Sequence, residues 1–314
     1  MLAILSACSS GDGGGGLGQG GNNNNGNNDG WQQGVFFDWG GFYQQCDSTL
    51  DQNNFLRSYS NDTYLWYDEI VDRDPGLYND PLQYFDLLVT NELSPSGQPK
   101  DKFHFTYDTE EWEQLSQSGV SAGYGIQWAF LSNTPPRDLR IAYTEPNSPA
   151  TNLAEPLTRG ARILEIDGVD INDNTQAGID TLNAGIYPAP GEEHTFTVQD
   201  LGSTGTRTVT MTAGSITSAP VQNTQVISTQ TGEVGYLTFN DHIATAEQAL
   251  IDAVNTLNAH DGGNGINDLV LDLRYNGGGY LAIASELAYM IAGSVPTAGL
   301  TFDALTFNDK HPVT

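Results

Sequence analysis

The spacing of hydrophobic residues changes along the chain, and each spacing predicts a different kind of structure. Between residues 47 and 118, apolar side chains recur every three to four positions, which predicts a helical region. Asp80 and Pro81 are the residue types of a helix N-cap followed by a first-turn proline, so a helix is expected to begin there. Residues 102–107 alternate between polar and aromatic side chains and predict one short strand.

Residues 119–214 contain short apolar runs that are separated by glycine, proline and aspartate. Such runs are typical of the strands of a compact β-rich module. One helix is predicted inside this module, from Thr175 to Ala184, and a hairpin is predicted around the loop at residues 202–205.

Strands and helices alternate in the region from residue 215 to residue 314. Residues 234–239 and 268–273 predict strands, and the second is almost continuously apolar, as in a buried parallel sheet. A helix is predicted after each, and residues 299–307 predict another strand. This order indicates the start of an α/β domain. The predicted fold class is therefore α+β and multidomain, with a helical N-terminal segment, a β-rich module and a partial α/β domain.

The first 46 residues show neither the helical nor the strand spacing of apolar residues. Residues 1–8 end in Leu5-Ser-Ala-Cys8, which resembles the lipobox of a bacterial lipoprotein signal and would make Cys8 the acylated residue. Residues 9–46 have the composition of a flexible tether, because positions 11–30 alone contain 10 Gly and 6 Asn. A tether behind a lipidated cysteine predicts a lipoprotein anchored in the cell envelope of a bacterium. A chance tetrapeptide remains the alternative.

The charge balance excludes two classes of partner. The chain has 39 acidic against 11 basic residues, a formal net charge of -28. Nucleic-acid binding needs clustered Lys and Arg, and so does electrostatic docking on anionic lipid. We therefore expect no nucleic acid, and membrane contact only through a lipid anchor. The five histidines are scattered without metal-ligand spacing, so no metal and no cofactor are predicted.

The strongest local signal is the stretch from Leu271 to Tyr280, in which an apolar strand ends in three consecutive glycines and a helix is predicted to follow. Glycines allow a sharp turn with unobstructed N–H groups, and a helix N-terminus favours negative charge. The stretch is thus a candidate cradle for an anion or oxyanion. It lacks the lysine of a Walker loop and the glycine spacing of a dinucleotide fingerprint. A tight connection without a ligand remains the alternative.

Two further motifs are interpreted as structural. Ser121 lies in a G-x-S-x-G match, but a nucleophile elbow needs a strand before the serine and a helix after it, and the predicted order here is reversed. Residues 170–174 resemble the start of a calcium loop. The glycine and glutamate that an EF-hand needs are replaced by Thr175 and Thr181, which favours a helix N-cap cluster.

The order of these segments resembles the C-terminal processing peptidases, which are tail-specific serine proteases with a PDZ domain and a tricorn-type core. The resemblance covers residues 50–314. Its motifs are Tyr64-Leu-Trp-Tyr67, Lys100-Asp-Lys-Phe103, Gly123-Tyr-Gly-Ile126, Asn147-Ser-Pro-Ala150, Arg159–Gly168 and the glycine-rich turn. The chain departs from the family pattern at Ala161, which stands where an acidic residue is usual.

This resemblance implies that residues 119–214 form a PDZ-like domain and residues 215–314 part of a ClpP/crotonase-like protease core. A PDZ-type loop binds a terminal carboxylate, and the peptide adds as an extra strand. The implied partners are proteins or peptides with free C-termini. The implied loop residues are Gly123, Tyr124, Gly125 and Ile126, and the implied oxyanion-hole candidates are Gly277 and Gly278.

In the family, a Ser nucleophile and usually a Lys base follow the glycine-rich turn and the next strands. None of the three lysines, Lys100, Lys102 and Lys310, stands in a matching place. The resemblance thus implies a serine-type endopeptidase that works by Ser/Lys acyl transfer, with its nucleophile missing from these 314 residues. The chain by itself is predicted to be inactive. Alternatives are a non-catalytic, lipid-anchored peptide-binding protein and an unstable fragment with an exposed strand edge.

Overall fold

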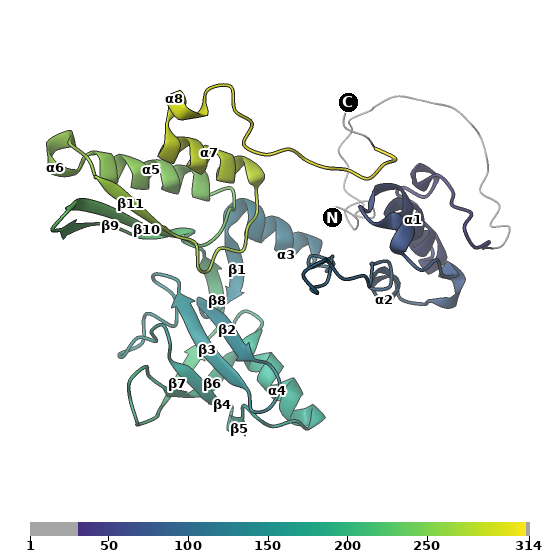
Figure 1. The fold of residues 1–314 in the computed structure, drawn as a ribbon. Coiled ribbons are helices and arrows are strands. Elements are labelled where there is room, and N and C mark those ends of the chain that lie inside the picture. Colours follow the sequence, from purple (N-terminus) through teal and green to yellow (C-terminus); the bar gives the residue numbers. More distant parts are fainter. Residues whose placement is uncertain (1–30, 312–314) are drawn as a thin grey trace. The chain divides into compact units, whose positions relative to one another are not determined.

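The computed structural model describes residues 31–311, so the lipobox with Cys8 and most of the expected tether lie outside the described residues. The described chain mixes helices with several β-sheets, which confirms the predicted α+β class. It forms two compact units. The first comprises the described residues up to Thr109 together with those from Asp303 onward, and the second comprises Glu110–Phe302 (Figure 1).

The first unit is helical. Its elements are η2 (Trp39–Gly41), α1 (Thr49–Thr63), η3 (Tyr67–Glu69), η4 (Pro75–Leu77) and α2 (Pro81–Phe85). The predicted cap is confirmed, because the Asp80 side chain accepts a 2.9 Å hydrogen bond from the N–H of Leu82. Its core packs α1 against α2 through Phe55, Leu56, Tyr84, Phe85 and Leu88.

The strand predicted at residues 102–107 is absent from the described fold. His104 shows why, since its ring stacks on Phe85 with centroids 4.1 Å apart and its Nε2 lies 2.8 Å from the Phe85 carbonyl oxygen. His104 therefore packs on the end of α2, while the aromatic side chains of Phe103, Phe105 and Tyr107 are exposed and form no face of a sheet.

Helix α3 (Thr109–Glu113) lies at the start of the second unit and is followed by a π-helix, η5 (Gln114–Ser118), and a β-rich module. A six-stranded antiparallel sheet has the order β2-β3-β4-β6-β7, with β5 paired to β4. The strands are β2 (Ile126–Ser132), β3 (Asp138–Thr144), β4 (Arg162–Ile166), β5 (Val169–Asp170), β6 (Glu193–Gln199) and β7 (Arg207–Thr212). A two-stranded sheet pairs β1 (Val120–Gly123) with β8 (Gly214–Thr217).

The helix predicted inside this module is confirmed as α4 (Gln176–Ile186). Its N-cap is Thr175, whose side chain accepts a hydrogen bond from the N–H of Gly178. The core beneath it is aliphatic and aromatic, and Leu139, Ile163, Phe196 and Val198 are fully buried in it.

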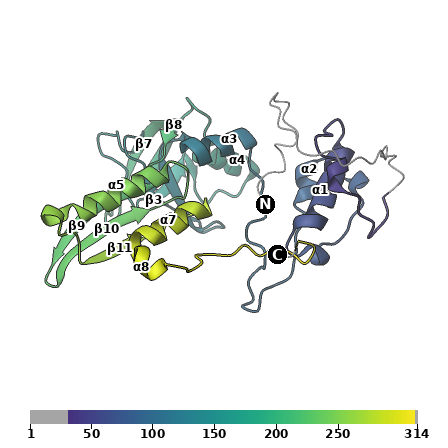
Figure 2. The same ribbon diagram turned by 90° about the horizontal axis from the view of Figure 1, so that it is seen from above.

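The rest of the second unit is a three-stranded sheet with helices on one face (Figures 1 and 2). Its order is β11-β10-β9, in which β10 pairs parallel to β11 and antiparallel to β9. The elements are β9 (Val221–Thr229), β10 (Gly232–Phe239), α5 (Ala246–Asn258), α6 (His260–Gly263), β11 (Asp268–Asp272), α7 (Leu281–Ala292) and α8 (Ser294–Thr297). Leu237 and Phe239 of β10 pack against Leu250 of α5 and Leu287 of α7.

Two expectations for this region are wrong. The apolar strand at 268–273 is parallel as predicted, but within the described residues it lies at the edge of its sheet, and Val270 is 47% exposed. Residues 299–307 form no strand, because the chain leaves the sheet after α8 and joins the first unit from Asp303 onward.

Candidate functional site

The carboxyl ends of β10 and β11 meet at one edge of the three-stranded sheet, because the two strands are parallel. Residues 240–242 follow β10, and residues 273–280 connect β11 to α7. Ligands of α/β sheets bind at this kind of edge. The sequence reasoning found the second loop by its glycines but missed the first, and the signal for it was its position directly after a predicted parallel strand.

Hydrogen bonds hold the two loops together. The Gly277 N–H donates to the carbonyl of Asn240 over 3.2 Å, and the His242 N–H donates to that of Gly278 over 2.8 Å. The N–H of Tyr280 donates a hydrogen bond to the carbonyl of His242 over 2.9 Å. The turn is therefore built against the loop after β10 and has a defined backbone geometry.

Two glycines of this turn are required by its conformation. Gly278 has φ +93° and Gly279 has φ +125°, values that L side chains rarely adopt. A Cβ on Gly279 would also lie 2.7 Å from the carbonyl oxygen of His242. Gly277, by contrast, has no positive φ and open space around its Cβ position.

The free N–H group of the turn is not one of the two expected from the sequence. The Gly277 N–H is bonded to Asn240, and the Gly278 N–H donates to the side-chain oxygen of Asn276 over 2.9 Å. Gly279 is an exposed residue, and no described residue accepts a hydrogen bond from its N–H. This geometry points away from Gly277 and Gly278 as anion donors and towards Gly279, one residue before the N-cap of α7.

The polar side chains around the turn are partly buried. Burial raises the pKa of the Asp241 carboxyl, although a hydrogen bond from the His242 N–H opposes the shift. Asn240 is 3% exposed, and neither the nitrogen nor the oxygen of its side-chain amide has a hydrogen-bond partner among the described residues. At the end of β11, hydrogen bonds from Arg274 hold the pKa of Asp272 well below its usual range, and the Tyr236 hydroxyl donates to the same carboxylate over 2.6 Å.

A second candidate site is the loop from Gly123 to Ile126, where the sequence predicted peptide binding. The Tyr124 side chain is buried in the core, so only its backbone can take part in binding. Gly125 has φ +72°, and its Cβ position lies 2.2 Å from the Cβ of Ser148, which makes glycine obligatory there.

At the end of this loop, the backbone N–H and C=O of Ile126 face the unpaired edge of the sheet. The N–H of Glu145 donates to the carbonyl of Gly125 over 2.8 Å, beside the Ile126–Thr144 pair. This bond makes the pair a non-hydrogen-bonded one, so the N–H and C=O of Ile126 face away from β3. β2 lies at the edge of its sheet within the described chain, and that edge is therefore unpaired next to the loop.

Glu145 anchors the loop from inside. Its carboxylate accepts hydrogen bonds from the N–H of Ala219 over 2.9 Å, the Gln222 side-chain amide over 3.1 Å and the Ser218 hydroxyl over 3.3 Å. Burial raises the pKa of this carboxyl, although those hydrogen bonds lower it in part. A single buried acid thus ties the end of β3 to the connection between β8 and β9.

The remaining motifs have structural roles. Ser121 lies inside β1 opposite Ile216, so it stands in a paired strand and not in a strand-to-helix elbow. The acidic cluster before α4 caps that helix, since Asp173 accepts a hydrogen bond from the N–H of Thr175 over 2.7 Å. Both observations agree with the interpretation made from the sequence.

Two of the three lysines are engaged inside the first unit. Lys100 is paired with Glu69. Lys310 Nζ donates to the carbonyl of Asn61 over 2.6 Å and lies 3.5 Å from the centroid of the Tyr67 ring.

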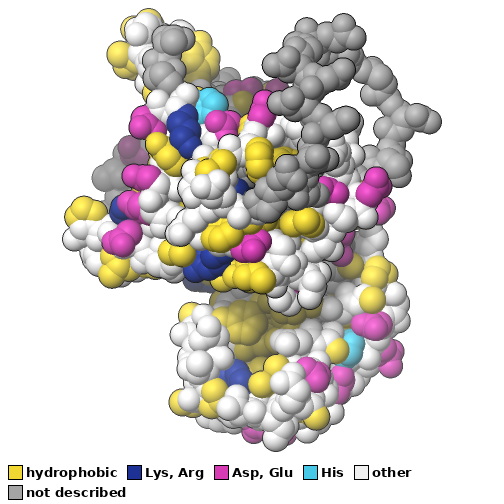
Figure 3. All heavy atoms as spheres, turned by 90° about the vertical axis from the view of Figure 1, so that its right-hand side faces the viewer, with side chains coloured by type: hydrophobic (Ala, Val, Ile, Leu, Met, Phe, Trp, Pro, Cys, Tyr) yellow, Lys and Arg dark blue, Asp and Glu magenta, His cyan; other side chains and the backbone are white. Residues whose placement is uncertain are grey.

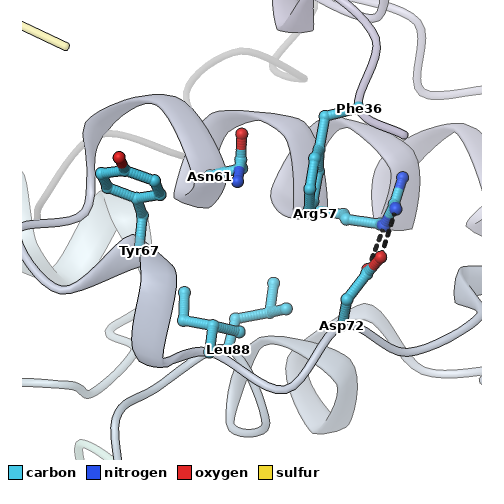
Figure 4. Close-up of a pocket in the computed structure, with 7 residues that line it drawn as sticks. Phe36, Arg57, Asn61, Tyr67, Asp72 and Leu88 are labelled. Carbon is cyan, nitrogen blue, oxygen red and sulfur yellow. Dashed lines mark hydrogen bonds and ion pairs between the residues drawn. The ribbon is translucent and has the colours of Figure 1, made fainter. Parts of the chain in front are cut away.

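The first unit also contains a recess of about 240 Å³, open mouth included (Figure 4). Arg57 and Asp72 form its polar wall, and the guanidinium lies 4.2 Å from the centroid of the Phe36 ring. Arg57 also donates to the carbonyl of Val35, so its charge is used within the protein. We assign this recess a structural role.

Two regions of the chain match models of one protein family. Residues 233–300, which contain β10, β11 and the glycine turn, match peptidase family S41, and residues 51–107 match the peptidase S41 N-terminal domain. A carboxyl-terminal-processing protease of Picosynechococcus sp. is 31% identical over 177 residues, or 56% of this chain and 39% of that protein. These matches support an assignment to the C-terminal processing peptidases, on the similarity of residues 51–107 and 233–300 to peptidase family S41.

Two further similarities cover larger parts of this chain. The chloroplastic carboxyl-terminal-processing peptidase 2 of Arabidopsis thaliana is 23% identical over 249 residues, 76% of this chain and 45% of that protein. The chain thus spans less than half the length of these two relatives. A crystal structure of a putative S41 protease from Bacteroides fragilis superposes with a TM-score of 0.45 at 20% identity, covering 73% of this chain and 57% of that one. No helix among residues 31–311 has both the length and the apolar character needed to span a membrane.

Proposed function

We propose that this chain is part of a serine-type endopeptidase of the S41 type that binds the C-terminal tail of a protein and cleaves a peptide bond by acyl transfer. The family matches and the names of the two relatives support this proposal. In such a reaction a serine oxygen attacks the peptide carbonyl while its proton passes to a lysine amine and then to the leaving amine. Water then releases the acyl group and regenerates the serine.

In this proposal, the nucleophile and the base belong to residues outside these 314. The hydrogen bonds of Lys100 and Lys310 within the first unit agree with that assignment. Residues 1–314 alone should therefore not cleave peptides.

The observation that carries the proposed tail recognition is the unpaired edge of β2 beside the Gly123–Ile126 loop. A peptide that adds antiparallel to β2 would bond to the outward N–H and C=O of Ile126, with its terminal carboxylate at the loop. Hydrophobic side chains gather in a hollow near the top of the lower lobe in Figure 3, which contains the six-stranded sheet. We therefore interpret residues 119–214 as a PDZ-like domain.

Gly279 supplies the proposed oxyanion contact. Gly279 is exposed, its N–H is unpaired among the described residues, and it lies one residue before the N-cap of the 12-residue helix α7. A hydrogen-bond donor aimed at the developing negative charge of an acyl-transfer intermediate is a large contributor to catalysis. The three-stranded sheet with α5 and α7 is then part of the protease core.

For the location we propose the bacterial cell envelope, with Cys8 lipidated and residues 9–46 as a tether. The support is the Leu5–Cys8 sequence and the composition that follows it. Metabolic labelling of the expressed full gene product with a palmitate analogue should mark the wild type and leave a Cys8→Ala variant unmarked.

Isothermal titration of residues 1–314 with a free-acid peptide and its C-terminally amidated twin tests tail recognition. We expect the amide to bind at least about tenfold more weakly, a loss of about 1.4 kcal/mol of binding free energy. Gly125→Ala should abolish binding, because its Cβ would overlap Ser148. Gly191→Ala is the matched control, since Gly191 also has a positive φ but has open space. Equal affinities for acid and amide would contradict the proposal.

A second candidate function is a non-catalytic, lipid-anchored peptide-binding protein. The observation that favours it is that the described chain contains the whole carboxylate loop and its sheet, while Lys100 and Lys310 are bound elsewhere. Sequencing the gene beyond codon 314 separates the two candidates. A downstream Ser and Lys in frame supports the peptidase, and a stop codon supports the binding protein.

A further inference from the structure

We propose that His242 is a positioning residue that sets the direction and the donor strength of the Gly279 N–H. The inference deepens the proposed function and rests on it, because this N–H matters for catalysis only if it binds the oxyanion. His242 stands alone in the sequence and not at metal-ligand spacing, so no motif singles it out.

Two donors from His242 converge on one carbonyl oxygen. Its backbone N–H lies 2.8 Å from the oxygen of Gly278, and its Nδ1 lies 3.1 Å from the same oxygen. A carbonyl oxygen only accepts hydrogen bonds, so Nδ1 must carry a proton. The neutral imidazole is therefore held in its Nδ1–H tautomer.

The carbonyl of Gly278 and the N–H of Gly279 belong to the same peptide unit. In a trans peptide these groups point in opposite directions, so a carbonyl fixed towards His242 directs the N–H away from it. Two hydrogen bonds to the oxygen also polarise the amide, which strengthens the N–H as a donor. His242 thus acts on the oxyanion contact without touching the substrate.

The imidazole is itself held in place. Its ring centroid lies 4.4 Å from that of Phe239, and the backbone carbonyl of His242 accepts the N–H of Tyr280 over 2.9 Å. The absence of a side chain at Gly279 permits the close approach to this carbonyl. These contacts hold His242 and the turn in place before any substrate binds. A donor that stabilises a transition state must be held in place in this way.

NMR spectroscopy of residues 1–314 tests the geometry without any activity. With ¹⁵N-labelled histidine and ¹³C-carbonyl glycine, we expect the neutral His242 ring to carry its proton on Nδ1 and to show a scalar coupling across the hydrogen bond to the Gly278 carbonyl carbon. His242→Ala should shift that carbonyl resonance and the Gly279 amide, and His242→Asn should restore both in part. A ring protonated on Nε2 alone would overturn the inference.

Kinetics on the full gene product tests the consequence. His242→Ala should lower kcat about 10- to 100-fold with KM unchanged, less than the loss of a whole oxyanion donor. His242→Asn should recover most of the rate, and His260→Ala, which removes an exposed histidine paired with Glu233, should leave it unchanged. If the wild type cleaves and His242→Ala cleaves equally well, this inference fails alone. If the wild type does not cleave, the proposed function fails, and the NMR result still decides the geometry.

Discussion

The carboxylate of Glu145 and the N–H of Ala219 form a 2.9 Å hydrogen bond that joins two segments 74 residues apart. One end of this link holds Gly125 through the Glu145 backbone, and the other holds the entrance to β9 through Gln222. The loop proposed to bind carboxylates is thus fixed by the same residue that fixes the connection to the three-stranded sheet.

Removing this link should destabilise the second unit. Glu145→Ala leaves the partly buried N–H of Ala219 without its acceptor, at a cost of about 1–3 kcal/mol in the free energy of unfolding. Glu145→Gln keeps an oxygen for Ala219 and Gln222 and can place its amide towards the Ser218 hydroxyl, so it should be nearly neutral. Chemical denaturation of the three proteins at pH 7 measures both effects. An alanine variant as stable as the glutamine variant would contradict the anchoring role.

The same residue predicts a pH dependence. The folded pKa of Glu145 is raised above the unfolded value of about 4.3. The raised pKa therefore contributes to the free energy of unfolding. This contribution is fully present below about pH 4.3 and is lost as the pH rises through the folded pKa. Relative to wild type, Glu145→Gln should gain stability as the pH rises from 4 and reach a plateau above the folded pKa. Parallel stability curves for the two proteins would refute this assignment.

Local signals in the sequence predicted the parts of the fold that local chemistry determines. The cap at Asp80 is found where the sequence predicted it, the helix predicted from Thr175 has that residue as its cap, and the predicted parallel strand ends at Asp272, one residue early. The segments at residues 102–107 and 299–307 were predicted as strands and are not. The large apolar side chains that alternate in these segments are exposed. A strand also needs a neighbouring strand to pair with, and the local sequence pattern does not show whether one is present.

The candidate site was predicted only in part, for a similar reason. Three consecutive glycines mark the turn, but which N–H stays free depends on Asn240 and His242, residues about 36 positions earlier in the chain. A single sequence contains no signal for that pairing. The N–H groups of the expected donors Gly277 and Gly278 are bonded within the chain, and we therefore propose their neighbour Gly279 as the donor.

The turn itself yields a test with a matched control. Gly279→Ala should destabilise the second unit by more than about 2 kcal/mol, because it combines a positive φ with a Cβ 2.7 Å from the His242 carbonyl oxygen. Gly277→Ala should change stability by less than about 0.5 kcal/mol, since its site is open and its φ is not positive. Thermal unfolding of both variants measures the contrast. Similar melting temperatures would show that the turn differs from the one described.

The last described residues should stabilise the first unit. Asn308 is buried, and its side-chain amide donates to the carbonyls of Asp62 and Tyr64 at the end of α1 over 2.8 and 3.0 Å. Asn308→Ala should cost about 1–3 kcal/mol and speed amide hydrogen exchange in α1. Leu305→Ala, at a 64% exposed position in the same segment, should leave exchange unchanged. Unaltered exchange in the Asn308 variant would show that the segment does not dock there.

The ion pair beside the recess predicts the acid sensitivity of the first unit. Burial raises the pKa of Asp72, but hydrogen bonds from Arg57 and Gly34 outweigh it and hold that pKa below its usual value. A lowered folded pKa contributes stability above the unfolded value of about 3.9, and this is lost as the pH falls through the folded pKa.

Asp72→Asn should therefore cost about 3 kcal/mol at pH 7, because the Arg57 guanidinium is 3% exposed and would lose its counter-charge. The difference in the free energy of unfolding between the variant and the wild type should shrink as the pH falls below about 4. There the wild type begins to lose the stability that the ionised Asp72 contributes. Asp86→Asn serves as the control, since Asp86 is exposed, and should be neutral throughout. Denaturation of the three proteins between pH 3 and pH 7 measures this, and a constant difference across that range would exclude an ionised Asp72 as the source of the stability.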